Sequence, residues 1–524
     1  MTTDITDAER ARLRPYVTDT AGPVFALTNL PEVVKGALFA RYSRSPKSLR
    51  RLLLDEFMPD GGDAGVRGEG EERAAALYDR VLAQYGDDSV AQLGAAHVAV
   101  EGASNVLTKV LQWGRIASYL EQSTRYIAYT DRPGGRYRYH LPPHVAAHPD
   151  LGPRYAEVLD RAFTVYADLL PRMVAHWDAA VPDDGSPAAA RARAIQARAL
   201  DSLRGLLPAA TTSNMGIFAS GQAYEALLVR LMAHPLAEAR ECGVAMLAQL
   251  RQVIPAFLTR VDRPDRGGRH AEYLRAARTT MEELASAVPA AAGVAEDERV
   301  TLLDWDPDGE ERVLAHALWP HTDLPLDVVR AHVAGLAGHE RARMLREIAG
   351  DRPDRRVRPG RALEATTYTF EVVCDYGAYR DLQRHRLLSL QAQPLTPSLG
   401  WSLPPEVAAA GHGEAYAGVM HESAQLYEAL ADAFPHDAPY AVSLAHRLRF
   451  TMVMNAREAM HLIELRSQPQ GHDAYRRVAQ RMHDRIAEVA GHHAIAGMMR
   501  FVDHTDAHAG RLAAERRQES RATS

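Results

Sequence analysis

Only two of the 524 residues are cysteines, Cys242 and Cys374, and they lie far apart in apolar stretches without the spacing of metal ligands. We interpret both as small buried hydrophobic residues. No pairing of cysteine with histidine suggests a thiol nucleophile. The 23 histidines also lack the spacing of a metal site, so the sequence predicts no bound metal.

Long apolar runs are also missing, because none approaches the roughly 20 residues of a membrane span. A targeting segment would have a basic start and an apolar core, and the amino terminus has neither. A net charge of −6 and an isoelectric point near 6.5 provide no general attraction to nucleic acid or to anionic membranes. These absences predict a cytoplasmic protein with no nucleic-acid or membrane partner, in which local arginines hold any anionic ligand.

The chain is long enough for more than one domain. A length of 524 residues with 46% hydrophobic content is sufficient for two or more domains with proper cores. A stretch at 300–308 reads as a strand, a proline and a helix start, and it echoes the pattern at 25–33. This echo indicates that the chain restarts, and we predict two copies, residues 1–295 and residues 296–524.

A basic triplet, Arg384-His385-Arg386, follows the apolar run 368–379. Two guanidiniums beside an imidazole concentrate positive charge, which favours an anionic partner such as a phosphate. A solvated surface cluster is the other interpretation, since short basic runs usually face water.

A second polar cluster lies in residues 454–466, which the sequence predicts to be a helix. At about 100° per residue, Asn455 and Arg466 fall on nearly the same face. Arg457 and His461 are four residues apart and are also neighbours on a helix. One helix would then present two arginines, an amide and an imidazole to one cleft.

A third cluster lies in the amino-terminal half, where Glu121, Ser123 and Arg125 are spaced by two. These side chains point to one side if the backbone is extended there. A carboxylate, a hydroxyl and a guanidinium that converge in this way suit a nucleotide, with Arg and Ser for its phosphate. A polar loop with an internal Glu–Arg pair is the alternative.

These stretches together resemble the flavin-dependent thymidylate synthases, whose signature is Arg-His-Arg, seven residues and Ser, with a later helix Asn-Ala-Arg…Leu-Arg. Residues 384–386 supply the opening of the signature, but Pro394 stands where Ser is expected. In residues 113–125 the first Arg and His are replaced by Trp113 and Gly114, while Ser123 is in place. Each half keeps what the other has lost.

Two further positions match the family. Arg204 opens the pattern Arg-x-x-Leu-Pro, whose arginine belongs to the nucleotide site, and Glu364 matches an acidic position on the flavin side. The losses are again reciprocal. The counterparts of Asn455, Arg457 and Arg466 in the first half, and of Arg204 in the second half, are Ser220, Gln222, Leu231 and Pro439.

The resemblance implies an α+β fold with two tandem domains, each a central antiparallel sheet with surrounding helices, and a helix-rich chain overall. It also implies active sites at subunit interfaces and a homodimer that forms a pseudo-tetramer. From the pattern of residues we predict a strand at 368–374 that leads into a helix carrying Arg384. After Ser398 we predict only helices, at 408–433, 440–465 and 473–499.

The implied chemistry is reductive methylation of dUMP to dTMP with FAD, NADPH and methylenetetrahydrofolate, at one composite site built from both copies. Arg466 would be the catalytic arginine, held against the uracil. The implied substrate-binding residues are Glu121, Gln122, Ser123, Thr124, Arg125, Arg204, Arg384 and Arg466. The implied cofactor-binding residues are Glu364, Arg384, His385, Arg386, Asn455, Arg457 and His461.

Two alternatives stay open at this stage. One is an enzyme that modifies C5 of another pyrimidine nucleotide such as UMP, and residues near the ribose would decide between the two substrates. Because neither copy holds a whole site, a non-catalytic scaffold or nucleotide-responsive regulator of the same fold is the alternative from another class.

Overall fold

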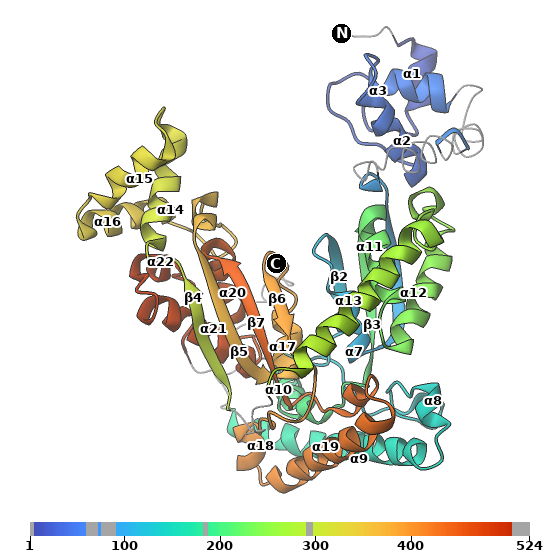
Figure 1. The fold of residues 1–524 in the computed structure, drawn as a ribbon, viewed down its shortest axis with the longest axis vertical. Coiled ribbons are helices and arrows are strands. Elements are labelled where there is room, and N and C mark those ends of the chain that lie inside the picture. The colour runs from blue at the N-terminus through green and yellow to red at the C-terminus, as the bar shows by residue number, and fades with distance from the viewer. Residues whose placement is uncertain (1–4, 59–71, 75–90, 182–186, 290–296, 506–524) are drawn as a thin grey trace. The chain divides into compact units, whose positions relative to one another are not determined.

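The structure is a computed structural model that describes residues 5–58, 72–74, 91–181, 187–289 and 297–505 (Figure 1). By packing, the chain divides into two compact units that are interleaved in sequence. The first unit contains residues 1–103, 110–122 and 213–289, and the second contains residues 104–109, 123–212 and 290–524. The predicted boundary between the copies at residue 295 lies outside the described residues, so the limits of the copies stay a prediction.

The first unit is built on an antiparallel pair, β2 and β3, in a three-stranded sheet of order β1-β3-β2. Strand β3 alternates between buried and exposed residues, as expected for a strand with one face on a core. Ser220 caps the following helix by accepting a hydrogen bond from the backbone N–H of Ala223. The elements assigned to this part of the chain are α1 (Asp7–Leu13), α2 (Glu32–Tyr42), α3 (Leu49–Leu52), η1 (Leu53–Phe57), β1 (Ala95–Ser104), α7 (Asn105–Leu111, which crosses the unit boundary), β2 (Ala117–Glu121), β3 (Thr212–Ser220), α11 (Gly221–Met232), α12 (Ala237–Leu250), η6 (Pro255–Leu258), η7 (Pro264–Gly268) and α13 (Arg269–Ser286).

The second unit is built on a four-stranded antiparallel sheet of order β4-β5-β7-β6. Its strands are β4 (Arg299–Trp305), β5 (Thr367–Asp375), β6 (Ser389–Ala392) and β7 (Arg447–Asn455). Helices α20 (Ala456–Arg466) and α21 (Asp473–Glu488) pack against this sheet (Figure 1). The sheet thus carries α20, the helix with the predicted flavin-side residues.

The predicted strand at 368–374 is confirmed, but the prediction of a helix over 440–465 is wrong in its first part. Residues 447–455 form β7, a central strand that pairs with both β5 and β6. Its side chains alternate between buried Leu448, Phe450, Met452 and Met454 and less buried neighbours, so the period is two. That alternation was readable in the sequence as a strand signal.

The other helices of the second unit form two groups. Helices α9, α10 and α19 pack together, with α18 and η5 at their ends, and α14, α15, α16 and α22 form the second group. Their bounds are α8 (Pro143–Ala146), α9 (Leu151–Ala180), α10 (Ala188–Leu203), η5 (Arg204–Leu206), α14 (Gly309–Leu318), α15 (Leu326–Ala334), α16 (Gly338–Ala349), η9 (Arg361–Ala365), α17 (Tyr376–Leu382), α18 (Pro405–Ala409), α19 (Gly413–Ala433), η10 (Ala438–Ala441) and α22 (His493–Met498), with short 3-10 turns η4 (Pro133–Gly135) and η8 (Trp319–His321).

Each unit therefore contains an antiparallel sheet with helices around it, and the predicted helix-rich α+β fold is confirmed. Among the described residues, no helix combines the length and the apolar character needed to cross a membrane.

Candidate functional site

Asp381, near the end of α17, is surrounded by arginines from both halves of the sequence. It is 6% exposed, and its Oδ2 accepts a hydrogen bond from Arg204 Nη1 at 3.3 Å. Its Oδ1 lies 3.4 Å from Arg384 Nη1. Burial alone would raise the pKa of Asp381, but the charges of Arg384 and Arg204, with those of Arg466 and Arg125, outweigh burial and lower this pKa. One carboxylate thus gathers four of the predicted site arginines.

The segment that holds Arg384 differs from its predicted form. Helix α17 begins at the cap residue Asp375, whose Oδ1 accepts from the N–H of Ala378 at 2.8 Å, and it ends at Leu382. Arg384, His385 and Arg386 therefore lie in the turn after the helix, and not within it. The turn exposes 36% of the Arg384 side chain, whereas His385 is 7% exposed.

Arg125 is held by protein groups at all three of its side-chain nitrogens. Its Nε and Nη2 donate to the two carboxylate oxygens of Asp201 at 2.8 and 2.9 Å. Its Nη1 donates to Tyr475 Oη at 2.8 Å, and its Nη2 also donates to the carbonyl of Gln470 at 3.0 Å. Arg125 therefore connects its loop to α10 and α21, in addition to lying near Asp381.

The predicted convergence of Glu121, Ser123 and Arg125 required an extended backbone, and the structure does not have one there. Strand β2 ends at Glu121, and the N–H of Tyr126 donates to Ser123 O at 3.3 Å in a turn. Glu121 and Gln122 belong to the first unit, where Glu121 Oε2 accepts from Gln112 Nε2 at 2.8 Å. Thr124 is buried, and with Ser123 and Arg125 it belongs to the second unit.

Arg466, the last residue of α20, is held by an uncharged partner. Its Nε donates to His385 Nε2 at 2.9 Å, and its guanidinium carbon lies 5.5 Å from the centre of the Tyr475 ring. The Arg125 guanidinium lies 5.7 Å from the same ring. Burial lowers the pKa of Arg466, but an arginine keeps its charge in proteins. The Tyr475 ring therefore brings one arginine from each half together.

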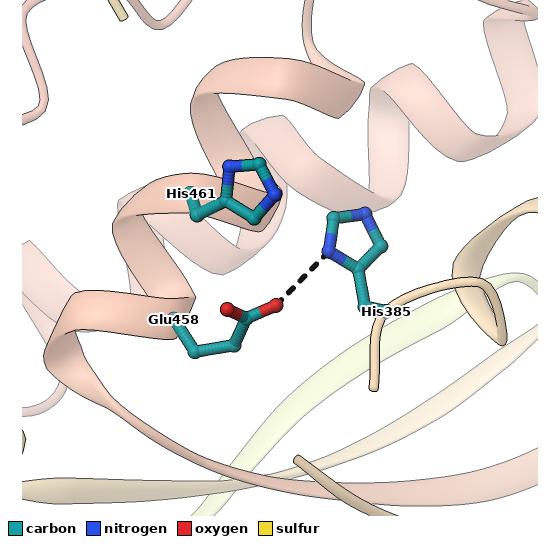
Figure 2. Close-up of side chains that lie close together, drawn as sticks. All are labelled: His385, Glu458 and His461. Carbon is teal, nitrogen blue, oxygen red and sulfur yellow. Dashed lines mark hydrogen bonds and ion pairs between the residues drawn. The ribbon is translucent and has the colours of Figure 1, made fainter. Parts of the chain in front are cut away.

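His385, Glu458 and His461 form a compact cluster (Figure 2), and Arg466 reaches it through its bond to His385. His385 Nδ1 lies 3.1 Å from Glu458 Oε1, and the two imidazole rings are 5.3 Å apart between centres. Burial lowers the pKa of His385 well below its usual value and that of His461 to about 4, so both rings are neutral near pH 7. Burial raises the pKa of Glu458 to about 7.

The remaining residues predicted on the cofactor side lie around the start of α20. Arg457 donates from Nε to the carbonyl of Pro359 at 3.0 Å and lies 3.3 Å from Glu364 through Nη1. The side chain of Asn455 caps α20 by accepting from the N–H of Glu458 at 2.9 Å. Arg386 is half-buried. The structure thus brings Glu364 and Arg457 together, while the amide oxygen of Asn455 caps α20.

A pocket of about 370 Å³ lies in the second unit. Of the predicted site residues, Arg204 lines it, together with Asp201, Asp375 and His472. Arg204 is 3% exposed, and its Nη2 has no hydrogen-bond partner among the described residues. Arg204 Nη2 lies 3.8 Å from Asp375 Oδ1, beyond hydrogen-bond distance. A buried guanidinium N–H without a hydrogen bond is costly, so Arg204 can donate to an anion that enters this pocket.

The sequence did not reveal the partners of the predicted site residues: Asp201 and Tyr475 bond to Arg125, Asp381 contacts Arg204 and Arg384, and Glu458 bonds to His385. Asp381 stands three residues before Arg384, which it contacts, whereas Asp201 and Glu458 bond to residues far from them in sequence. Spacing of three on a helix was an available signal, although it does not by itself identify a partner. Tyr475 carries no such signal.

Asp375 provides a test of the electrostatics at this pocket. Burial raises its pKa to about 6, against the nearby charge of Arg204. The folded state therefore keeps a proton that the unfolded state has already lost, and stability falls as pH rises from about 4 to 6. Asp375→Asn preserves the helix cap. We expect the Tm of this variant minus the Tm of wild type to be larger at pH 7.5 than at pH 5. The increase corresponds to about 1 kcal/mol.

Scanning calorimetry at the two pH values measures this difference. Asp265→Asn, at an exposed carboxylate, is the control and should leave the difference in Tm unchanged between the two pH values. An Asp375→Asn difference that is the same at both pH values would show that Asp375 is already ionised at pH 5.

Comparison with known proteins agrees with this arrangement. The family model described as thymidylate synthase complementing protein matches two regions of the chain, residues 37–256 and 302–491. A UPF0159 protein of Chlamydia muridarum is 36% identical over 532 residues, covering 99% of both chains. A UPF0159 protein of Thermoplasma acidophilum is 32% identical over 515 residues, covering 93% of this chain and 99% of its own length.

The two matched regions agree with a tandem arrangement, in which residues of both halves contribute arginines to the surroundings of Asp381. On the match and on the relatives together, the chain belongs to the thymidylate synthase complementing protein family, the family of the flavin-dependent thymidylate synthases.

Proposed function

We propose that the chain catalyses the reductive methylation of dUMP to dTMP, with FAD, NADPH and methylenetetrahydrofolate, at a single composite site. The observation that carries this proposal is the arrangement around Asp381. Arg125 and Arg204 come from the first matched region, and Arg384 and Arg466 from the second, yet all four lie within one compact unit. The motif halves that are separate in sequence are thus supplied by one chain.

The residues present suit a bound flavin nucleotide. Arg384 and Arg457 are each about one third exposed, and Arg386 and His461 are half-buried. The positive charge of the three arginines would favour an anionic group. These residues, with His385 and Asn455, would hold the FAD. When bound, the flavin supplies the redox and carbon-transfer chemistry.

The part of Arg466 is electrostatic. Its direct partner His385 is neutral, so the guanidinium charge is not cancelled by a contacting carboxylate. A fixed positive charge against the pyrimidine ring would favour the N3-deprotonated form and stabilise charge that develops in the transition state. Asp381 orients Arg204 and Arg384 through direct contacts. Among the described residues, no hydrogen bond joins Asp381 to Arg466.

For the nucleotide phosphate, we propose Arg204 as the first donor, with Ser123 and Arg125 beside it. Arg204 Nη2 is buried and has no hydrogen-bond partner among the described residues, whereas Arg125 is paired with Asp201 at two nitrogens. Arg125 would contact the phosphate after giving up part of that pairing. Thr124, in the same unit, is proposed to complete the substrate side.

We further propose that the chain forms a homodimer, a pseudo-tetramer of four copies. Size-exclusion chromatography with light scattering measures the mass directly, and a monomer at micromolar concentration would exclude it.

A non-catalytic role is the second candidate, and one observation favours it. All three side-chain nitrogens of Arg125 donate to protein groups, namely Asp201, Tyr475 and Gln470, as expected of a residue kept for packing. Action on a related nucleotide such as UMP remains the enzymatic alternative.

A visible absorbance spectrum of the purified protein tests the proposal. We expect flavin bands, or their appearance on reconstitution with FAD, and we expect NADPH to bleach them faster when dUMP is present. A colourless protein that FAD cannot reconstitute would favour the non-catalytic role. Turnover of UMP in preference to dUMP would replace the substrate while keeping the site.

A further inference from the structure

The hydrogen bonds of His385 determine which of its ring nitrogens carries the proton. Arg466 Nε–H can only donate, so His385 Nε2, 2.9 Å away, must accept. A neutral imidazole has one N–H, which must then lie on Nδ1. Nδ1 faces Glu458 Oε1 at 3.1 Å and donates to it (Figure 2). The three residues therefore form one directed chain of hydrogen bonds.

We propose that Glu458 and His385 are positioning residues that fix the guanidinium of Arg466 for the pyrimidine ring, through the chain Glu458–His385–Arg466. This inference rests on the proposed function. Glu458 polarises the imidazole, which makes Nε2 a better acceptor for Arg466. Because the imidazole is neutral, it orients Arg466 without neutralising the guanidinium charge, as a contacting carboxylate would. Arg125, by contrast, is paired directly with Asp201.

The same three groups also have the composition of a metal site, since ligand atoms of His385, Glu458 and His461 lie within 4.8 Å of one another. Two features oppose a cation there. His385 Nδ1 carries the proton and offers no lone pair while Arg466 occupies Nε2. Positive charges also surround the cluster, from Arg355, Arg358, Arg386, Arg457 and Arg466.

The ionisation of Glu458 makes this chain pH-dependent. Burial raises its pKa to about 7, while Arg358 and Arg457 act to lower it. Glu458 is therefore protonated below pH 7 and becomes a charged, stronger acceptor above it. The groups that face the cluster are His385 and Arg386 after α17, Arg457, His461 and Arg466 on α20, and Arg355 and Arg358 before η9.

The test compares wild type with Glu458→Gln, by calorimetric titration of dUMP into the purified full chain at pH 6.0 and pH 8.5. At pH 8.5 we expect Glu458→Gln to weaken binding about tenfold, the effect of losing one charge-assisted hydrogen bond. At pH 6.0, where wild-type Glu458 is protonated, the dissociation constants of the two proteins for dUMP should agree within about twofold. Ionisation of the nucleotide phosphate is common to both proteins and cancels in their ratio.

If the ratio of the two dissociation constants does not change with pH, Glu458 has only a structural role, and the proposal is overturned. The matched control is Glu347→Gln, the same chemical change at an exposed pair on α16, and its ratio should stay near one. A stoichiometric Zn²⁺ that binds wild type and is lost in His461→Ala would identify a cation site and also overturn the proposal.

A second measurement separates this inference from the proposed function. Nitrogen-15 spectra of histidine-labelled protein, with His385 assigned by its loss in His385→Asn, report the tautomer without any substrate. The Nδ1–H tautomer is expected, and the Nε2–H tautomer overturns the chain of hydrogen bonds. If wild type shows the expected tautomer but does not bind dUMP, the proposed function fails and with it the role of the chain in pyrimidine binding.

Discussion

Arg466→Ala is expected to lower kcat for dUMP methylation by about 10²–10³-fold, the usual cost of losing one preorganised charge at a transition state. The guanidinium lies at the end of α20, held by His385 and stacked near Tyr475. Arg466→Lys should also be strongly impaired, because an ammonium cannot reproduce the Nε–H bond to His385 together with the planar contact. Steady-state kinetics of the reconstituted protein measure both.

Arg115→Ala is the control for this experiment. Arg115 is exposed and belongs to the degenerate copy of the motif, so its loss should leave turnover within about twofold of wild type. If Arg115→Ala is as damaging as Arg466→Ala, the assignment of the working motif halves is wrong. Arg125→Ala should also abolish turnover, but it leaves the half-buried Asp201 carboxylate without its bidentate partner, so its Tm must be measured beside its activity.

Glu464→Gln is expected to destabilise the second unit by about 3–5 kcal/mol, since it breaks a fully buried ion pair. Glu464 and Arg352 have side chains that are 1% and 3% exposed, and they form two bonds, of 2.8 and 2.6 Å. Arg352 also donates to the carbonyls of Val357 and Met498. Without the carboxylate charge, a buried guanidinium stays uncompensated. Thermal and urea unfolding measure the loss.

Glu347→Gln makes the same change in an exposed pair with Arg343, whose side chains are 63% and 59% exposed. Surface pairs of this kind contribute at most about 1 kcal/mol, so its Tm should barely move. Equal losses in Glu464→Gln and Glu347→Gln would mean that the Arg352 pair is open to solvent. Because Glu464 lies on α20, its loss should also reduce nucleotide binding by Arg466.

Local patterns in the sequence predicted several elements correctly. The helix predicted at 454–466 is α20, shorter by its first two residues because Met454 and Asn455 end β7 and cap the helix. The strand predicted at 368–374 lies within β5. In each case the hydrophobic period and the capping residue are local properties.

The prediction failed where a local pattern suited two structures. Residues 447–455 contain two methionines, two arginines and a leucine, which favour helices, yet they form the central strand β7 because β5 and β6 lie on both sides of it. The turn at Ser123 was likewise decided by contacts outside its own segment. Arg125 is held by Asp201, 76 residues away, and by Tyr475, 350 residues away.

The sequence by itself determined the family, the two-part arrangement and the identity of the candidate arginines, since these depend on residue types at fixed spacings. Only the tertiary structure decided that Arg125, Arg204, Arg384 and Arg466 share the surroundings of Asp381 within one unit. The pairs that place them join residues 177 and 81 positions apart, as in Arg204–Asp381 and Arg466–His385. No local pattern specifies such partners, because folding brings them together by burying the sheet and helices that carry them.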